Sequence, residues 1–450
     1  MSYVPARDDV SRAAFLRRSG ALGIAGAAAL GFPLLEEPHV ARAASPSRKI
    51  VAATGKAVVR IGHIEGFSGY MADTAYSQSS GMQLAVEEAN KRNSRVRFEL
   101  VKGDDLNDAT AGLSEAQRLV KYERVDVLTG VSSTAVGLEV MRFAERAGVL
   151  FLQIGTNGTS ITGSDACRVS FRAACNNQML TQALAPALLK EGKRWFFLTV
   201  DYAFGIDAQV RLTRLLLEAG GRIAGSMRHA NGETNFSSHM RRIAGSGADV
   251  LVLCSGGADV QNAIAAIARA GLHKRLRIGG VQLDNDNVVG LPVDKLVGSV
   301  WGYVWGPDAG GRRTAEIYGK LKARAVGFPS NWSQYLGYIA GEQLTARILA
   351  VGTTDTMRLV EAFENEHPFD AGKRNPSRWR RCDHQLVQDT YAACIVPPRR
   401  RRNAYEFFRI VNAVSGNRAA GACAGRDART AAFRMGGSVP ERRDYAPVFF

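Results

Sequence analysis

The sequence lacks the short motifs that mark the common hydrolases, P-loop proteins and zinc proteases. It contains no Gly-x-Ser-x-Gly, no Gly-x-x-x-x-Gly-Lys-[Ser/Thr] and no His-Glu-x-x-His. Its seven histidines are scattered. Asp383-His384 places an acid beside a histidine, but neighbouring residues on a strand point to opposite faces. The sequence therefore predicts no catalytic residues, and an exported enzyme with an unrecognised site is the alternative.

Cysteine is scarce, and none of the six cysteines lies in a Cys-x-x-Cys pair. A structural zinc site is therefore not expected, and we predict neither a metal nor a cofactor. Cys167 and Cys175 are close enough in the chain for a local disulfide, although two buried free thiols fit the sequence equally well. Cys254 is favoured as a free thiol because it ends an apolar strand. The pairing of the others stays open.

Long apolar runs are absent beyond the N-terminus, so the mature chain is expected to be soluble. Arg17 and Arg18 precede an uncharged run at Ala21–Phe32 that is too short to span a bilayer but suits a signal peptide. Small residues end the segment, and we predict cleavage after Ala43. The stretch resembles a twin-arginine signal in which Ala13 replaces the second arginine, so a general secretory route is equally open. A signal anchor is the competing interpretation.

Acidic residues are few at the C-terminal end, where residues 371–450 carry +10 of the net charge of +16. The charge is therefore a property of one end and not of the whole chain. We interpret 397–450 as a basic C-terminal extension, an extended arm with one strand at Phe407–Val411. The sequence contains no helix-turn-helix, zinc-finger spacing or RNA-binding aromatic motif, so we predict no nucleic-acid partner.

Strands and helices alternate in two consecutive blocks, which is typical of parallel sheets covered on both faces. The expected fold is therefore α/β, with two similar doubly wound parallel-sheet lobes. In open sheets of this kind a ligand binds beyond the carboxyl ends of the strands. The strands are expected at Val58–Ile64, Val96–Val101, Val125–Leu128, Val149–Gln153, Arg194–Val200, Arg222–Arg228, Val250–Cys254 and Arg277–Val281.

Five polar or aromatic segments follow these strands and are candidate ligand contacts. Gly130–Thr134 and Gly155–Thr159 offer hydroxyls and helix N-termini for a carboxylate or carbonyl, although each could simply cap a helix. Asp201–Gly205 carries two aromatic residues that could line a cleft or pack in the core. Ser255–Gly257 could admit a ligand or turn the chain. Asp284–Asn287 could bind an ammonium group or form a turn; it lacks the spacing of a calcium loop.

Several segments, in order and spacing, resemble the leucine/isoleucine/valine-type family of periplasmic binding proteins, the substrate-capturing subunits of ABC transporters. They are Ile61–Tyr70, Leu84–Asn90, Asp104-Asp105, Gly130–Thr134, Gly155–Gly163, Trp195–Gly205 and Arg378–Tyr391. The resemblance spans about 58–396.

The resemblance implies two lobes joined by a three-strand hinge, as in the type I fold. We expect a signal peptide at 1–43, a flexible lead-in at 44–57, lobe 1 at 58–173 plus 300–352, and lobe 2 at 174–299 plus 353–396. The crossings are expected near Arg172–Asn176, Gly298–Gly302 and Gly352–Asp355. The implied protein is a periplasmic monomer that binds a small molecule and works with ABC permease and ATPase subunits in the inner membrane. A sensory module with the same cleft is the alternative.

The resemblance also implies which residues contact the ligand. Lobe 1 would grip a carboxylate, and lobe 2 would add an aromatic wall. A tyrosine of the amino-acid binders is replaced here by Gly256 or Gly257, and no acid stands near Val281-Gln282 for a ligand ammonium. Unless Asp284 substitutes, an amide, an aromatic acid or another small carboxylate is the expected ligand. The candidate residues are Tyr70, Thr74, Ser132, Ser133, Gly155, Thr156, Asn157, Tyr202, Phe204, Gly256 and Asp284.

Overall fold

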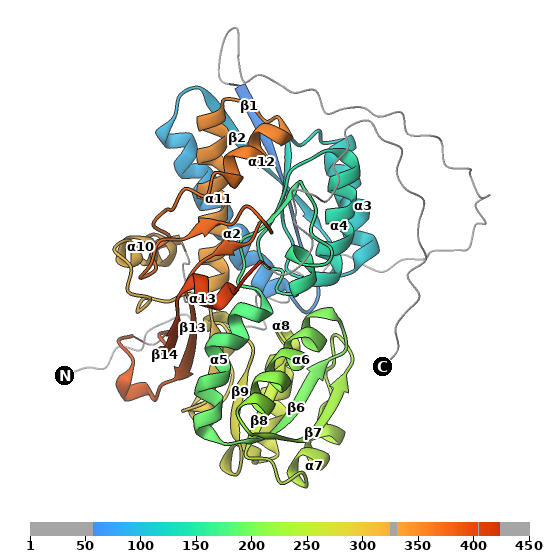
Figure 1. Cartoon of the computed structure of the whole chain (residues 1–450), viewed down its shortest axis with the longest axis vertical. Helices are drawn as coiled ribbons and strands as arrows, with labels where there is room; N and C mark the ends of the chain where they lie inside the picture. The colour runs from blue at the N-terminus through green and yellow to red at the C-terminus, as the bar shows by residue number, and fades with distance from the viewer. Residues whose placement is uncertain (1–56, 325–330, 404, 424–450) are drawn as a thin grey trace, which may run out of the picture. The chain divides into compact units, whose positions relative to one another are not determined.

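The structure is a computed structural model that describes residues 57–324, 331–403 and 405–423. The predicted signal peptide, its cleavage site, nearly all of the lead-in and the last part of the extension lie outside the described residues. Within the described part of the chain, no helix combines the length and apolar character needed to cross a membrane. The described strands form two large sheets (Figure 1) and one two-stranded sheet.

Lobe 1 is built on a five-stranded parallel sheet with the order β2-β1-β3-β4-β5. Side chains that alternate along its strands enter two apolar clusters, Ile61 on one face and Ile64 on the other. Helices α3 and α4 cover one face, and α2 covers the other (Figure 1). The elements are β1 (Ala57–Glu65), α2 (Ala72–Arg92), β2 (Val96–Asp104), α3 (Ala109–Lys121), β3 (Val127–Gly130), α4 (Thr134–Ala147), β4 (Phe151–Gln153), the 3₁₀ turn η1 (Thr159–Thr162) and β5 (Ser170–Arg172).

Lobe 2 is built on a seven-stranded sheet with the order β14-β13-β10-β9-β8-β6-β7. Its five sequential strands β6–β10 are parallel, and β13 and β14 add an antiparallel edge. The two-lobe α/β prediction is therefore confirmed. The elements are α5 (Asn177–Glu191), β6 (Arg194–Val200), α6 (Ala203–Glu218), β7 (Arg222–His229), α7 (Ser237–Ala244), β8 (Val250–Cys254), α8 (Gly257–Arg269), β9 (Arg277–Gly280), α9 (Asn285–Val288), β10 (Val300–Tyr303), β13 (Thr390–Ile395) and β14 (Phe408–Val414).

The chain crosses between the lobes three times, but two of the predicted crossings were misplaced. The first runs from β5 into α5, as predicted. The second follows Tyr303, because Val300–Tyr303 is β10 and pairs with β9 and β13 inside lobe 2. The predicted assignment of residues 300–303 to lobe 1 was therefore wrong: hydrogen bonds to both neighbours fix this strand in the lobe 2 sheet.

The third crossing lies near residue 388 and not at Gly352–Asp355. Gly352 is the left-handed C-cap of α11 (Trp332–Val351), and the chain then enters α12 (Thr356–Glu364) without leaving lobe 1. Thr356 Oγ1 donates a 2.7 Å hydrogen bond to the carbonyl of Gly148. His384 stacks on Phe171, with ring centroids 3.9 Å apart. Residues 353–387, including β11 (Arg378–Trp379) and β12 (Leu386–Val387), therefore pack on lobe 1 and not on lobe 2 as predicted.

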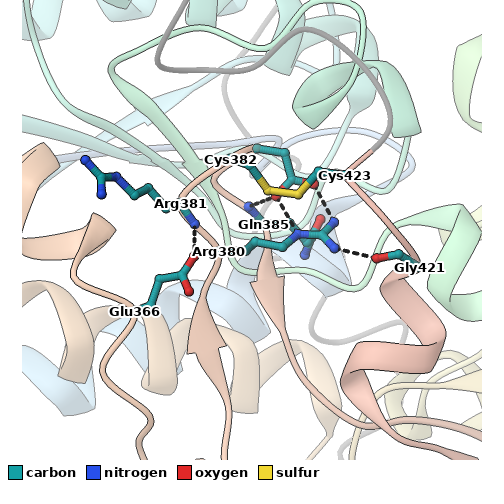
Figure 2. Close-up of a disulfide and its surroundings, with 8 residues drawn as sticks. Glu366, Arg380, Arg381, Cys382, Gln385, Gly421 and Cys423 are labelled. Atoms are coloured by element: carbon teal, nitrogen blue, oxygen red, sulfur yellow. Dashed lines mark hydrogen bonds and ion pairs between the residues drawn. A yellow bond between two sulfur atoms is a disulfide. The ribbon is translucent and has the colours of Figure 1, made fainter.

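The described part of the C-terminal extension is fixed to the protein and is not a loose arm. The predicted strand at Phe407–Val411 is β14, which pairs along β13. After the short helix α13 (Gly416–Ala420), Cys423 forms a disulfide with Cys382 (Figure 2). Arg380, beside this disulfide, donates a hydrogen bond to the carbonyl of Gly421 at 2.6 Å. The alternative of a Cys167–Cys175 bridge is wrong: both side chains are buried and are not joined to each other.

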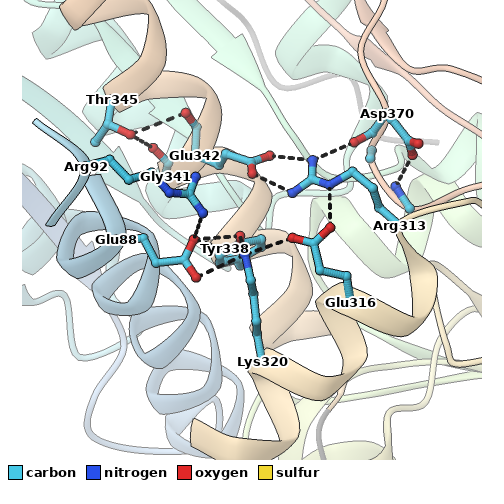
Figure 3. Close-up of polar contacts among 12 residues, drawn as sticks. Glu88, Arg92, Arg313, Glu316, Lys320, Tyr338, Gly341, Glu342, Thr345 and Asp370 are labelled. Carbon is cyan, nitrogen blue, oxygen red and sulfur yellow. Dashed lines mark hydrogen bonds and ion pairs between the residues drawn. The ribbon is translucent and has the colours of Figure 1, made fainter. Parts of the chain in front are cut away.

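Two helices of lobe 1, α2 and α11, cross backbone against backbone. A side chain on Gly81 would strike the backbone of α11, and one on Gly337 would strike the backbone of α2. Glycine is therefore required at both crossing points. A polar seam with α10 (Thr314–Arg324) borders this crossing (Figure 3): Lys320 lies 3.1 Å from Glu88, and Arg313 lies 2.7 Å from Glu342. The close approach therefore fixes how α2 is oriented against α11.

Candidate functional site

A hydrogen-bonded row of polar side chains lies at the carboxyl edge of the lobe 1 sheet. Glu65 ends β1, and Ser132 follows the neighbouring strand β3, so both reach the same edge. Ser132 Oγ donates to Glu65 Oε2 at 2.8 Å and accepts from Gln78 Nε2 at 3.1 Å. A side chain at Gly155 would enter the space of Gln78 and Ser132. Glycine after β4 is therefore what lets this row form.

Asp105, directly after β2, adds a second buried carboxyl group to this edge. Its Oδ1 accepts from the backbone N–H of Asn107 at 2.8 Å, while its Oδ2 has no hydrogen-bond partner among the described residues. Burial raises the pKa of Asp105 to about 6. Burial, and then the charge of Asp105, raise the pKa of Glu65 well above its usual value. This edge of lobe 1 is therefore acidic and desolvated.

Lobe 2 contributes aromatic side chains and a third carboxyl group. Tyr202 and Phe204 follow β6, and a Cβ on Gly256, after β8, would lie 3.9 Å from the Phe204 ring. Asp259 lies in the first turn of α8, where its Oδ2 accepts from the backbone N–H of Gly232 at 3.2 Å. Burial raises the pKa of Asp259 to about 6. The segments after β6 and β8 therefore lie close together.

Hydrogen bonds connect the two lobes directly. The N–H of Ala258 donates to the carbonyl of Tyr70 at 2.9 Å, beside Gly257. Ser77 Oγ donates to Asp286 at 2.9 Å, and Thr159 Oγ1 donates to Asp207 at 2.8 Å. Each bond joins a residue of lobe 1 to one of lobe 2. The structure is therefore a closed arrangement, in which groups at the strand ends of both lobes are buried.

The Tyr70 side chain lies between the polar groups of the two lobes. Burial raises the pKa of Tyr70, hydrogen bonds with Asn231 and Tyr202 oppose this shift, and the charges of Asp259 and Asp105, from opposite lobes, add to it. Burial, and then Tyr70, raise the pKa of Tyr202. Two of the candidate ligand-contact residues, Tyr70 from lobe 1 and Tyr202 from lobe 2, therefore lie close together at the junction.

Asp284 does not stand free to receive a ligand ammonium. Its Oδ1 accepts from the backbone N–H of Trp332 at 3.1 Å, and its Oδ2 accepts from the N–H and Oγ of Ser333, both at 2.9 Å. These are orphan donors at the N-terminus of α11, which favours a negative charge. Asp284 therefore caps a lobe 1 helix from lobe 2, and its predicted contact with the ligand is corrected to a structural role.

Of the remaining predicted residues, two form hydrogen bonds within the fold and two lie at the carboxyl edge of the lobe 1 sheet. Thr156 Oγ1 donates to Gln153 at 2.9 Å, and Asn157 Nδ2 donates to the carbonyl of Cys175 at 2.6 Å, so both polar groups serve the fold. Thr74 and Ser133 are buried at the starts of α2 and α4, at the carboxyl edge of the sheet. For these two the prediction of a ligand contact stays a prediction.

Sequence reasoning missed several polar residues of this junction, among them Glu65, Gln78, Asp105 and Asp259. Glu65 and Asp105 occupy strand ends, so the rule that found Ser132 could have found them. Gln78 and Asp259 lie on helices, and no local pattern marks them. Their placement depends on the α2–α11 crossing and on closure of the lobes.

The description "Periplasmic binding protein" belongs to a family model that matches residues 58–397, more than half of the chain. This match and the two-lobe fold agree. The chain belongs to the periplasmic binding protein family. Among curated relatives, the Leu/Ile/Val-binding protein homolog 7 of Brucella suis is 27% identical over 215 residues, which cover 45% of this chain and 54% of that protein. This periplasmic binding protein thus spans about half the length of the curated relatives it matches.

Solved structures of the family share its fold. A periplasmic binding protein from Burkholderia mallei superposes with a TM-score of 0.74 at 22% identity, over 80% of this chain and 96% of that one. A solute-binding protein of an ABC transporter from Rhodopseudomonas palustris, in complex with 3,4-dihydroxybenzoic acid, has a TM-score of 0.70 at 18% identity, over 80% and 98%. At these identities the likeness establishes the fold alone.

Alanine at Gly257 should prevent complete closure of this periplasmic binding protein. Gly257 has a φ of +56°, and a Cβ there would lie 2.5 Å from the Tyr70 carbonyl oxygen across the junction. We expect ligand affinity to fall about tenfold or more, because closure would need a backbone shift. Titration calorimetry with a captured ligand measures this.

Gly271→Ala is the matched control, because Gly271 has a φ of +68° and open space around its Cβ position. It should reproduce the loss of stability caused by backbone strain, about 1 kcal/mol, without the loss of affinity. Equal affinities for the two variants would contradict a role of Gly257 in closure.

Proposed function

We propose that this chain is the exported solute-binding subunit of an ABC importer. It captures a small polar organic ligand between its lobes and delivers it to permease and ATPase subunits in the inner membrane. Export follows the N-terminal signal, with cleavage after Ala43, and the protein acts as a periplasmic monomer without catalytic activity. The proposal rests on buried polar atoms without hydrogen-bond partners among the described residues, which lie near the strand ends of both lobes where hydrogen bonds join the lobes.

The mechanism is hinge closure. Three chain crossings let the lobes separate, and hydrogen bonds such as Ala258 to Tyr70, Ser77 to Asp286 and Thr159 to Asp207 join them when they close. A ligand that contacts both edges adds interactions only in the closed form, so binding shifts the population toward closure. Closure also removes the ligand from water and presents a surface formed by both lobes, which the transporter can distinguish from the open form.

A thermal-unfolding screen tests the proposal. We expect a captured ligand at 100 times its Kd to stabilise the protein by about 2.7 kcal/mol and to raise the midpoint by about 3 °C at this chain length. The panel contains amino acids, amides, urea, amines, aromatic acids and small dicarboxylates. The ligand should be recovered unchanged, and small-angle scattering should show compaction that Gly257→Ala reduces.

Other outcomes favour different functions. Chemical conversion of the ligand would favour an enzyme. A ligand that closes the lobes but is not taken up by cells carrying the cognate permease and ATPase would favour the sensory module. No stabilisation by any class of compound in the panel would contradict capture of a small polar ligand.

A further inference from the structure

Most of the unpartnered polar atoms at the junction belong to groups that accept hydrogen bonds. In the closed structure, five buried carboxyl or amide oxygens around Tyr70 and Ser132 lack hydrogen-bond partners among the described residues. Gln78 is the most telling, because it is not acidic, is 0% exposed, and is held in place by its own bond to Ser132. The atoms are Glu65 Oε1, Gln78 Oε1 and Asp105 Oδ2 from lobe 1, and Asp259 Oδ1 and Gln282 Oε1 from lobe 2.

An orphaned buried acceptor is costly, so the occupant of the junction must supply donors. Tyr70 Oη is also buried, lies beside the side chains of Asn231 and Tyr202, and can donate once. One hydroxyl cannot satisfy five acceptors. A ligand rich in N–H groups would satisfy them, whereas a carboxylate would add further acceptors to a set that already has too many.

In the part of the chain that the structure describes, no basic side chain neutralises these carboxyl groups. Among the described residues, the charges that act on Glu65, Asp105 and Asp259 are those of other acids: Asp105 on the first, Asp104 and Asp108 on the second, and Glu233 on the third. Buried carboxylates are normally paired with a cation. A closed junction without a ligand therefore holds three unpaired acids.

The aromatic lining suits a cation as well. Tyr202 and Phe204 have ring centroids 6.0 Å apart, and Tyr70 joins them from the opposite lobe. Aromatic faces attract ammonium, amidinium and guanidinium groups, most strongly where water is excluded.

Resting on the proposed function, we propose that the ligand is an organic cation, an amine or amidine, whose N–H groups bind Glu65 and Asp105 of lobe 1 and Asp259 of lobe 2. The cation supplies the missing donors and the missing positive charge together. It also links the lobes: closure brings the three carboxyl groups out of water, and a cation between them offsets that cost. Asp284, bound to α11, takes no part.

The test compares shape-matched compounds that differ in charge, using the full chain at pH 7.5. The three sets are acetamidine, acetamide and acetate; benzamidine, benzamide and benzoate; and putrescine, 1,4-butanediol and succinate. Thermal shift and calorimetry are the measurements. We expect at least one cation to bind about tenfold or more tightly than its neutral and anionic counterparts.

Two outcomes would overturn the inference. If acetate, benzoate, succinate or a neutral compound binds and the matched cation does not, the ligand is not a cation, although the protein still captures a solute. If no member of any set binds, the cation class is overturned, and the broader panel above decides capture separately.

Variants test the named residues with the best cation. Glu65→Gln and Asp259→Asn keep the shape and remove the charge, and each should weaken affinity about 30-fold. Glu218→Gln is the control, since that side chain is 62% exposed on α6. The unliganded midpoint of Glu65→Gln should not fall, because burial already disfavours the charged form of Glu65. A lower midpoint with unchanged affinity would show a structural role and overturn the assignment of Glu65.

Discussion

Replacing Asp284 with asparagine should lower the free energy of unfolding by about 3 kcal/mol at pH 7.5, or the midpoint by about 4 °C at this chain length. Asp284 accepts three hydrogen bonds from Trp332 and Ser333 at the start of α11. The asparagine amide has only one accepting oxygen, so its NH₂ group would face N–H or O–H donors of Trp332 or Ser333 and could not accept from them. The capping charge would be lost as well.

Asp286 provides the matched control two residues away. Burial, and then the charge of Asp284, raise the pKa of Asp286 well above its usual value. Its Oδ2 accepts from Ser77 Oγ and Asn331 Nδ2, both at 2.9 Å, and its Oδ1 has no partner among the described residues. Asp286→Asn keeps one accepting oxygen for both donors and removes an unfavourable charge. It should leave stability unchanged or raise it slightly.

Denaturant unfolding of both variants, followed by the fluorescence of the tryptophans, decides between a cap and a ligand contact. If Asp284 were a ligand contact only, Asp284→Asn would lose affinity without losing stability in the absence of ligand. A smaller loss for Asp284→Asn than for Asp286→Asn would contradict the capping role.

Removing the disulfide should cost about 4 kcal/mol. Cys382 and Cys423 are separated by 41 residues, and the chain-entropy model gives this value for a loop of that length. The bond ties the segment after β14 to the lobe 1 side of the third crossing, so its loss should also release α13 (Figure 2). Cys382→Ser, or reduction of the wild type, should lower the unfolding midpoint by several degrees.

Cys394→Ser is the control for this substitution, because Cys394 is half-buried in β13 and forms no disulfide. It should change the midpoint by much less and should leave the response to reductant intact. Peptide mapping without reductant should recover residues 382 and 423 in one linked peptide. Separate peptides, or a midpoint insensitive to reductant, would contradict the bond.

Much of the fold could be predicted because its signals are local. The apolar run Val250–Cys254 is β8 with the predicted bounds, and Arg194–Val200 is β6. Such runs, bounded by turn residues and alternating with amphipathic helices, are typical of parallel sheets. The end of α11 at Gly352 was also visible locally, since glycine favours the left-handed C-cap.

The lobe to which each element belongs could not be predicted in this way. Residues 353–387 carry ordinary helix and turn signals, yet contacts with Gly148 and Phe171 attach them to lobe 1. β10 belongs to lobe 2 because it pairs with β9 on one side and with β13 on the other, and β9 and β13 lie far apart in the chain. These pairings depend on which surfaces meet, and no window of sequence contains both partners.

The candidate site also has a part that local sequence predicts and a part that only the tertiary structure shows. The sequence by itself determined the strand ends, and therefore placed Ser132, Tyr202 and Gly256 at the sheet edges, because parallel strands bring their carboxyl ends together. Only the tertiary structure decided that Asp284 caps a helix of the other lobe, while the acceptors of Glu65 and Asp259 stay unsatisfied. The reason is physical: the role of a polar side chain depends on the donors, charges and water around it, and those come from segments far away in the chain.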